Sequence, residues 1–258
     1  MDHPNIVIVS GTEGRHRYFI QRLRSCFPHG ANLIEKSAYL QPPTTSEPEL
    51  KAWQWYFERR DKYEAQAFKW SEEPRSGNAD ILIPASQLNS PETLAQVQSL
   101  APDWIVAFGT SLFSKTFIET FPGLILNLHL GLPEWGRGSS CNFWPIHDKN
   151  LAALGTTVHR VDSGIDSGEV LARGNIPLAP DDCEQTLAWK TLVLGCDLMV
   201  QTLCDGQDKT LKPIPQKQLG PLHLKKEFDP QAVLKVKRMV ESGELKTLIE
   251  DYLAGKRD

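Results

Sequence analysis

Two polar side chains end a predicted buried strand and are spaced so that they face the same way. The segment Gly123 to Leu128 (GLILNL) is a short apolar run, and Asn127 and His129 lie two residues apart at its carboxyl end. Because alternate residues of a strand point to one face, the carboxamide and the imidazole can converge on one atom. Such groups stabilise a developing oxyanion and carry protons. A histidine at a strand end is also commonly structural, so the pair alone leaves both interpretations open.

Two later segments add to this pair. They are HLGLPEWGRG at His129 to Gly138 and GTTVHRVDSGIDSGEVL at Gly155 to Leu171. With these motifs in this order, the chain resembles the formyltransferases that use 10-formyltetrahydrofolate. The signature of that family is an Asn-x-His strand end, a Leu/Pro loop that runs into Arg-Gly, and a later Thr-x-His and Asp-x-Gly segment. The resemblance is strong over residues 101–177 and weak in the N-terminal strand and its glycine turn.

The resemblance implies a role for each matched residue. Asn127, His129 and Asp166 would form the catalytic trio, and His159 would be the family's second histidine, with a structural hydrogen bond and catalysis both open for it. The residues implied to bind the folate co-substrate are Ala107, Phe108, Gly109, Thr110, Leu112, Val161, Asp162 and Ile165. The residues expected to bind the acceptor are Arg15, Arg137 and Gly138, and a surface turn is the alternative for Arg137.

The implied reaction explains why these residue types are needed. A formyl group that moves from N10 of the folate to an amine passes through a tetrahedral species with a negative oxygen, and a proton must leave the amine. Asn127 would donate to the oxyanion, and His129 would stabilise the same oxygen and carry the proton. Asp166 would favour the charged imidazole and relay protons through water. The reaction requires no metal.

The surrounding sequence predicts elements that position these residues. Short apolar runs of the kind buried in parallel sheets alternate with helical periodicity, which indicates an α/β fold. The expected strands are Asn5–Ser10, Asn32–Glu35, Asp80–Ile83, Asp103–Phe108, Gly123–Leu128, Thr156–Val161 and Glu169–Ala172. We expect a Rossmann-like, mostly parallel sheet with helices on both faces. Residues 1–205 would form the catalytic domain and residues 206–258 a small C-terminal extension.

Capping signals and aromatic residues mark several of the expected helices. Ser90-Pro91 and Asp229-Pro230 are typical helix starts, and helical periodicity runs from Asp181 to Cys204. A charged, aromatic helix is expected over Glu47–Trp70, where the aromatic residues either close a core edge or stack on a ligand ring.

Composition narrows the class of protein. The chain has 258 residues, a net charge of −4 and five cysteines. An acidic balance disfavours nucleic acid as a partner, and an odd number of cysteines without a CxxC pair argues against disulfides and zinc. No signal peptide or membrane span is expected, which predicts a cytoplasmic location. A homodimer is left open.

The identity of the acceptor amine is inferred by elimination. The turn after the first strand carries Glu13 and lacks the glycine-rich sequence that binds phosphate, which argues against glycinamide ribonucleotide as the acceptor. Few residues follow Cys204, and the acidic charge disfavours initiator methionyl-tRNA. The favoured acceptor is a nucleotide-linked 4-amino sugar of surface polysaccharide synthesis, with Arg59 or Arg60 as further diphosphate contacts. Hydrolysis of 10-formyltetrahydrofolate and a non-catalytic folate-binding relative are the remaining alternatives.

Overall fold

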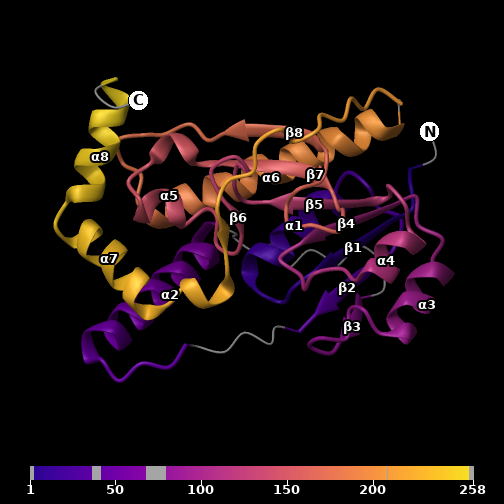
Figure 1. Ribbon diagram of the computed structural model, residues 1–258, viewed down its shortest axis with the longest axis horizontal. Helices are drawn as coiled ribbons and strands as arrows, with labels where there is room; N and C mark the ends of the chain where they lie inside the picture. The colour runs from indigo at the N-terminus through magenta and orange to yellow at the C-terminus, as the bar shows by residue number, and fades with distance from the viewer. Residues whose placement is uncertain (1–2, 37–41, 68–79, 208, 256–258) are drawn as a thin grey trace.

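The main sheet is mostly parallel, as predicted. The computed structural model describes residues 3–36, 42–67, 80–207 and 209–255, and its seven-stranded sheet has the order β3-β2-β1-β4-β5-β7-β8 (Figure 1). The first five strands in this order are parallel, and β7 and β8 join antiparallel. The strands are β1 (Ile6–Ser10), β2 (Asn32–Glu35), β3 (Asp80–Ile83), β4 (Trp104–Phe108), β5 (Ile125–His129), β7 (Gly155–Arg160) and β8 (Val170–Asn175).

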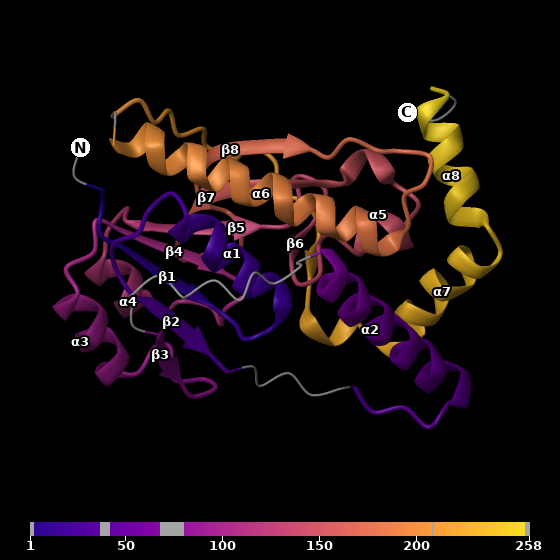
Figure 2. The same cartoon turned by 180° about the vertical axis from the view of Figure 1, so that it is seen from behind.

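Helices cover both faces of this sheet because its central strands are apolar on both faces. All five residues of β1 are buried. On one face, Ile6 and Ile8 pack with Phe19 of α1 (Gly14–Arg24) and Met199 of α6 (Glu184–Gln207). Figure 2 shows these two helices in front of the sheet. On the other face, β1 packs with α3 (Pro91–Ser99) and α4 (Lys115–Thr120).

The predicted helix starts are confirmed. The Ser90 hydroxyl accepts a hydrogen bond from the Thr93 backbone N–H, and the Asp229 carboxylate accepts one from Ala232 N–H. The remaining helices are α2 (Glu47–Ala67), α5 (Trp144–His147), α7 (Pro230–Glu241) and α8 (Glu244–Leu253), with the 3₁₀ turns η1 (Leu151–Ala153) and η2 (Lys225–Glu227). The last three residues predicted for α2, residues 68–70, lie outside the described residues.

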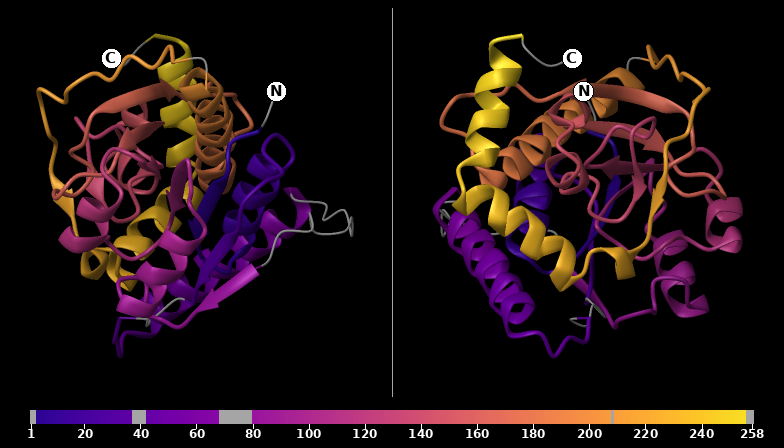
Figure 3. Two further views of the ribbon diagram at one scale, coloured as in Figure 1. Left: turned by 90° about the vertical axis from the view of Figure 1, so that its right-hand side faces the viewer. Right: turned by 60° about the vertical axis from the view of Figure 1, so that its left-hand side comes forward.

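The C-terminal helices build a separate layer at one end of the sheet. The right-hand view of Figure 3 shows α7 alongside α2, with α8 continuing from α7, on the side away from α3 and α4. Trp53 of α2 is buried, and its ring lies 5.6 Å from that of Phe228. Trp53, Val233, Val236 and Leu248 belong to one apolar cluster, so the interpretation of the α2 aromatics as a core edge is confirmed for Trp53. The boundary at residue 205 stays a prediction.

Helix α6 has the composition of a membrane span but the burial of a core helix. Among the described residues it is the one helix long and apolar enough to cross a membrane, judged by length and composition alone. Leu187, Cys196, Met199 and Leu203 are fully buried in the packed core. The apolar character of α6 is therefore explained by packing against the sheet.

An ion pair with a buried carboxylate ties α2 to α6, and its loss should destabilise the fold. Arg59 Nε and Nη2 donate to the two oxygens of Glu184 at 2.5 and 3.1 Å, and the Glu184 side chain is 1% exposed. Replacing Arg59 with alanine leaves an unpaired buried carboxylate and should lower the free energy of unfolding in urea by about 3 kcal/mol. Lys62→Ala is the matched control, because Lys62 lies at an exposed position of the same helix and should change stability by about 0.5 kcal/mol or less. Equal losses in the two variants would contradict this role.

Candidate active site

Antiparallel pairing of β5 with β7 brings the polar side chains of the two strands together. Asn127 lies directly opposite His159 in the register, and Asn127 Nδ2 is 3.1 Å from His159 Nε2. His129 lies on the same face of β5 as Asn127, as the alternation predicts, and both face the side chain of Asp166. Cross-strand neighbours approach closely enough for such contacts. The structure therefore adds His159 to the three residues expected at the site.

Asp166 reaches this cluster from the loop between β7 and β8. Its backbone has φ of +49°, a left-handed conformation that L residues other than glycine adopt at a cost. Its Oδ2 accepts a hydrogen bond from Gly138 N–H at 2.7 Å and lies 3.3 Å from His129 Nδ1. Its Oδ1 lies 3.2 Å from His159 Nε2 and 3.4 Å from Asn127 Nδ2. Four separate groups therefore converge on one carboxylate.

The partners of each imidazole constrain its protons. Nε2 of His129 lies 3.1 Å from the carbonyl of Gly136, which can only accept, so this nitrogen carries a hydrogen. Nδ1 of His129 lies 3.3 Å from Asp166 Oδ2, a contact that becomes an ion pair when the ring is protonated. His159 Nδ1 likewise donates to the carbonyl of Arg160 at 2.8 Å. The geometry thus fixes one hydrogen on each ring and leaves the other nitrogen of each ring facing Asp166.

Burial and charge act in opposite directions on this pair. Burial alone raises the pKa of Asp166, but His129, His159 and the Gly138 N–H together outweigh it and hold the pKa well below the ordinary carboxyl value. Burial lowers the pKa of His129 below that of a free imidazole, and the Asp166 carboxylate opposes this change. The carboxylate is therefore ionised at neutral pH, and the imidazolium is a readier acid than a solvated one.

The residues expected to bind folate lie at the end of β4 and in the loops that follow β4 and β7. Ala107 and Phe108 are buried in β4, whereas the Leu112 side chain is 65% exposed. Gly109 has φ of +67°, and a Cβ there would lie 2.3 Å from His16 Nε2, so the turn requires glycine. In the second loop Val161 and Ile165 are half-buried, and Asp162 is exposed. Thr110, the remaining predicted residue, is half-buried and follows Gly109.

A buried carboxylate that the sequence analysis missed fixes the first of these loops. Glu35, the last residue of β2, is 5% exposed, and it accepts hydrogen bonds from Ser111 N–H at 2.8 Å and Ser111 Oγ–H at 2.7 Å. The sequence feature that could have revealed Glu35 is its position at the carboxyl end of a predicted parallel strand, where binding sites lie.

The residues expected to bind the acceptor are engaged with the protein itself. Arg15 Nη1 pairs with Glu64 of α2 at 3.4 Å. Arg137 Nη1 donates to the carbonyl of Ile165 at 3.0 Å, beside the catalytic candidate Asp166. Arg137 and Gly138 form β6 (Arg137–Gly138), which pairs with β9 (Leu222–His223) in a short parallel sheet that the sequence analysis did not predict.

The turn between β1 and α1 is filled by a histidine and a carboxylate. His16 is 5% exposed, its Nδ1 lies 2.5 Å from Glu13 Oε2, and its ring packs 5.2 Å from that of Phe108. The hydrogen bond from His16, opposed by burial, lowers the pKa of Glu13 to about 2. A carboxylate therefore occupies the helix start where an open, glycine-rich turn would receive an anion.

This pair predicts an acid-sensitive contribution to stability. The pKa of Glu13 is lower in the folded protein, about 2 against an ordinary 4.5, so its contribution is complete above pH 4.5 and disappears as the pH falls to 2. We expect Glu13→Gln to lower the free energy of unfolding by about 1 kcal/mol at pH 6, allowing for solvent screening, and the difference from the parent to close by pH 2. Urea titrations across this range measure it. Glu58→Gln, at an exposed position of α2, should show no such closing gap, and a constant offset in Glu13→Gln would refute the assignment.

Sequence comparisons point to one family. A family model described as formyl transferase matches residues 54–203. The methionyl-tRNA formyltransferase of Koribacter versatilis is 31% identical over 155 residues, which are 58% of this chain and 49% of that protein. The chain therefore spans about half the length of the curated relatives it matches.

Structural comparison gives similar folds at low identity. A sugar N-formyltransferase from a Shewanella species aligns with a TM-score of 0.58 and 16% identity over 87% of this chain and 78% of that one. A formyltransferase from Anoxybacillus kamchatkensis, solved with UDP-4,6-dideoxy-4-formamido-L-AltNAc and tetrahydrofolate, aligns with a TM-score of 0.51 and 16% identity over 86% and 87%. Phosphoribosylglycinamide formyltransferase from Anaplasma phagocytophilum aligns with a TM-score of 0.58 and 14% identity over 86% and 99%. Because the family model covers more than half of the 258 residues, the chain belongs to the formyl transferase family.

Proposed function

We propose that this protein transfers a formyl group from 10-formyltetrahydrofolate to the amine of a small-molecule acceptor, a nucleotide-linked 4-amino sugar. The observation that carries the reaction type is the convergence of Asn127, His129 and His159 on the Asp166 carboxylate. This cluster supplies a hydrogen-bond donor, an acidic imidazole and a charged base in a chain of the formyl transferase family.

Each side chain has a place in the proposed step. The folate donor supplies the formyl group: a C–N bond forms to the acceptor amine, the bond to N10 breaks, and the amine proton ends on N10. Asn127 donates to the formyl oxygen as its charge grows, and the protonated His129 stabilises the same oxygen. The Asp166 carboxylate favours the protonated form of His129 against the effect of burial, and it passes the amine proton through water. The amine must arrive neutral, because a protonated amine has no lone pair for attack.

The two loops beyond β4 and β7 are proposed to hold the folate. Leu112 and Ile165 present apolar surface from opposite loops, and Glu35 fixes the Ser111 backbone beside Leu112. A flat heterocycle fits between apolar side chains whose backbone is held rigidly. Ala107, Phe108, Gly109 and Thr110 would form the floor, and Val161 and Asp162 the facing loop, as the family resemblance implies.

The N-terminal turn argues against glycinamide ribonucleotide as the acceptor. In this chain the Glu13 carboxylate and the buried His16 ring occupy that turn. A phosphate placed there would meet a negative charge and no open space. Arg15, the nearest cation, is already paired with Glu64. These contacts favour an acceptor whose phosphates bind elsewhere.

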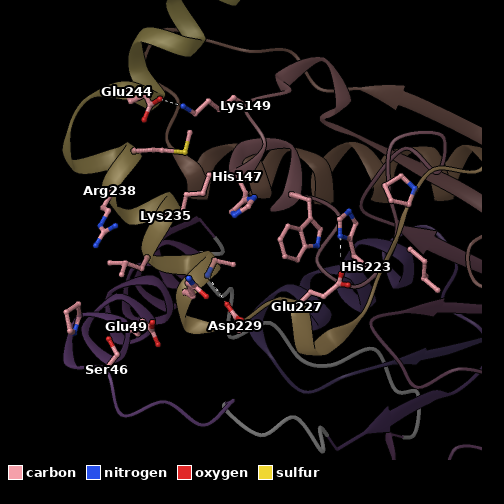
Figure 4. Close-up of a pocket in the computed structure, with 18 residues that line it drawn as sticks. Ser46, Glu49, His147, Lys149, His223, Glu227, Asp229, Lys235, Arg238 and Glu244 are labelled. Carbon is pink, nitrogen blue, oxygen red and sulfur yellow. Dashed lines mark hydrogen bonds and ion pairs between the residues drawn. The ribbon is translucent and has the colours of Figure 1, made fainter.

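A cavity of about 1160 Å³ between α5, α7 and β9 contains two basic side chains suited to the phosphates of such an acceptor (Figure 4). Three of its carboxylates already have partners. Glu244 pairs with Lys149, Glu227 pairs with His223, and Asp229 accepts a hydrogen bond at the start of α7. Among the described residues, no carboxylate lies within ion-pair distance of Lys235 or Arg238, which line the same cavity. Two such cations suit a diphosphate.

The cavity wall is connected to the candidate catalytic carboxylate through β6. Ser139 N–H donates to the carbonyl of His223 at 2.9 Å, and its neighbour Gly138 donates to Asp166. The His223 ring stacks on Trp144 at 4.5 Å with an angle of 12° between the planes. An extended nucleotide sugar bound in this cavity would therefore approach the cluster past β6 and β9.

Transfer to initiator methionyl-tRNA is the second candidate, favoured by the curated relatives. Against it stands the net charge of −4.

The test is release of tetrahydrofolate from 10-formyltetrahydrofolate with different acceptors. The panel contains nucleotide-linked 4-amino sugars, glycinamide ribonucleotide, methionyl-tRNA and no acceptor, with Asp166→Ala as the inactive control. Release that requires an amino sugar supports the proposal. Release without any acceptor indicates hydrolysis, and folate binding with no release in any reaction indicates a non-catalytic relative.

The cavity assignment is tested in the same assay. Lys235→Ala combined with Arg238→Ala should raise the KM of a nucleotide sugar by about 10-fold or more, since each lost charged hydrogen bond weakens binding. The KM of the folate should not change. Lys246→Ala with Lys62→Ala, at exposed positions outside the cavity, is the matched control.

A further inference from the structure

A segment after α6 contacts the loop that carries Asp166 and the loop that follows β5. Residues 214–223, called here the C-terminal strap, run from the start of β8 past the Asp166 loop to β9, which pairs with β6 (Figure 1). Ile214 pairs through both backbone groups with Val170, at 2.8 and 2.9 Å. At the other end of the strap, Gly220 N–H donates to the carbonyl of Pro133 at 2.8 Å, and Arg137 N–H donates to that of Pro221 at 2.9 Å.

One strap side chain binds the backbone of the Asp166 loop directly. Gln216 Nε2 donates to the carbonyl of Asp166 at 3.1 Å and to that of Gly168 at 2.7 Å. A carboxamide nitrogen has two hydrogens, so these two bonds use both. Among the described residues the Gln216 side chain makes no hydrogen bond to His129 or His159, and it therefore acts through the loop.

The loop needs such support because its backbone is strained. Asp166 has φ of +49°, and left-handed residues other than glycine persist only where the surroundings hold them. Two groups hold the backbone on either side of the carboxylate: Arg137 Nη1 on the Ile165 carbonyl, and Gln216 on those of Asp166 and Gly168. Of these two, only Gln216 bonds to the carbonyl of Asp166 itself.

We propose that Gln216 is a positioning residue for formyl transfer, which holds the 165–168 loop so that the Asp166 carboxylate faces His129 and His159. The strap thereby makes residues beyond α6 part of the active site. This inference rests on the proposed catalytic role of Asp166 but does not depend on the identity of the acceptor. Small displacements of such a group are costly, because productive geometry must be kept within a fraction of an ångström.

A first experiment needs no acceptor. The groups facing the His129 ring are Asp166, His159 and the Gly136 carbonyl, and of these Asp166 and the Gly136 carbonyl raise the pKa of His129, with Asp166 the larger of the two. NMR titration of the histidine rings in Gln216→Ala should therefore show the pKa of His129 moved down towards its value in Asp166→Asn. Gln218→Ala, at an exposed position on the same strap, should match the parent protein. An unchanged His129 titration in Gln216→Ala would overturn the proposal.

A second set of variants separates hydrogen bonding from packing. Gln216→Met keeps the length and volume of the side chain but has no N–H, and Gln216→Glu places a carboxylate against two carbonyl oxygens. Both should lower kcat by about 10- to 100-fold while the KM of the folate changes less than about twofold. If Gln216→Met keeps the parent kcat and the parent His129 titration, the side chain only fills space and the proposal is wrong. The titration is measured whether or not an acceptor is known, so this failure is distinct from failure of the proposed acceptor.

Discussion

Asp166→Asn is expected to lower kcat for formyl transfer by about 10³- to 10⁴-fold with little change in folding. Substituting an amide for a carboxylate that orients a catalytic imidazole costs this much in other enzymes. Here the hydrogen-bond pattern leaves the amide no acceptable orientation. Oδ2 accepts from Gly138 N–H, and Oδ1 faces Asn127 Nδ2, so the –NH₂ group of an asparagine would oppose a donor on either side.

Tetrahydrofolate release and thermal unfolding together measure this effect. The amide also removes the charge that opposes burial of the His129 imidazolium, so the pKa of His129 should fall further below its ordinary value. Asp61→Asn, at an exposed carboxylate of α2, is the matched control and should retain the parent kcat. A loss of less than about tenfold in Asp166→Asn would show that the carboxylate is not part of the reaction.

The sheet was predictable because its strands are set by local apolar runs. NIVIVS, NLIE and DILI are short and bounded by polar or turn residues, and each forms a strand within a residue of its predicted position. Buried parallel strands need apolar side chains on both faces, so the signal is continuous within the strand. The helix starts at Ser90 and Asp229 were equally local, since a cap depends on residues three positions apart.

The site was only partly predictable because several of its contacts arise from pairing. Alternation along β5 placed Asn127 and His129 on one face, but the role of His159 depends on a register that joins it to Asn127 across two strands. Glu35 binds Ser111 over 76 residues of sequence, and Gln216 binds Asp166 over 50. No local pattern marks either contact. The same holds for Arg15, whose partner Glu64 lies 49 residues away.

The strap also explains the glycine of the Arg-Gly motif. Gly138 has φ of +87°, and a Cβ there would lie 2.4 Å from the carbonyl of His223. The glycine therefore permits β6 to approach β9 while its N–H still faces Asp166. Sequence similarity alone predicts that this residue binds the acceptor; the geometry adds that it joins the strap to the candidate catalytic carboxylate of Asp166.

Asn127 should be the second residue whose loss nearly stops the reaction. Asn127→Ala removes a donor to the developing oxyanion, which typically lowers kcat by about 10²- to 10³-fold. Asn127→Asp keeps the shape but places a second carboxylate at the atom that now lies 3.4 Å from Asp166 Oδ1. Since two adjacent carboxylates cannot both ionise freely, the pair should retain a proton to higher pH.

The two substitutions distinguish loss of the hydrogen-bond donor at Asn127 from the effect of placing a negative charge beside Asp166. Both variants should have low kcat, but only Asn127→Asp should regain part of its activity as the pH falls, because the protonated carboxyl group can donate again where the amide did. The pH profile of tetrahydrofolate release, with Gln98→Ala as a control at an exposed amide of α3, measures this difference. If Asn127→Ala retains most of the parent kcat, the oxyanion must be stabilised by His129 alone, and the carboxamide of Asn127 would serve to orient His159 through the 3.1 Å contact between them.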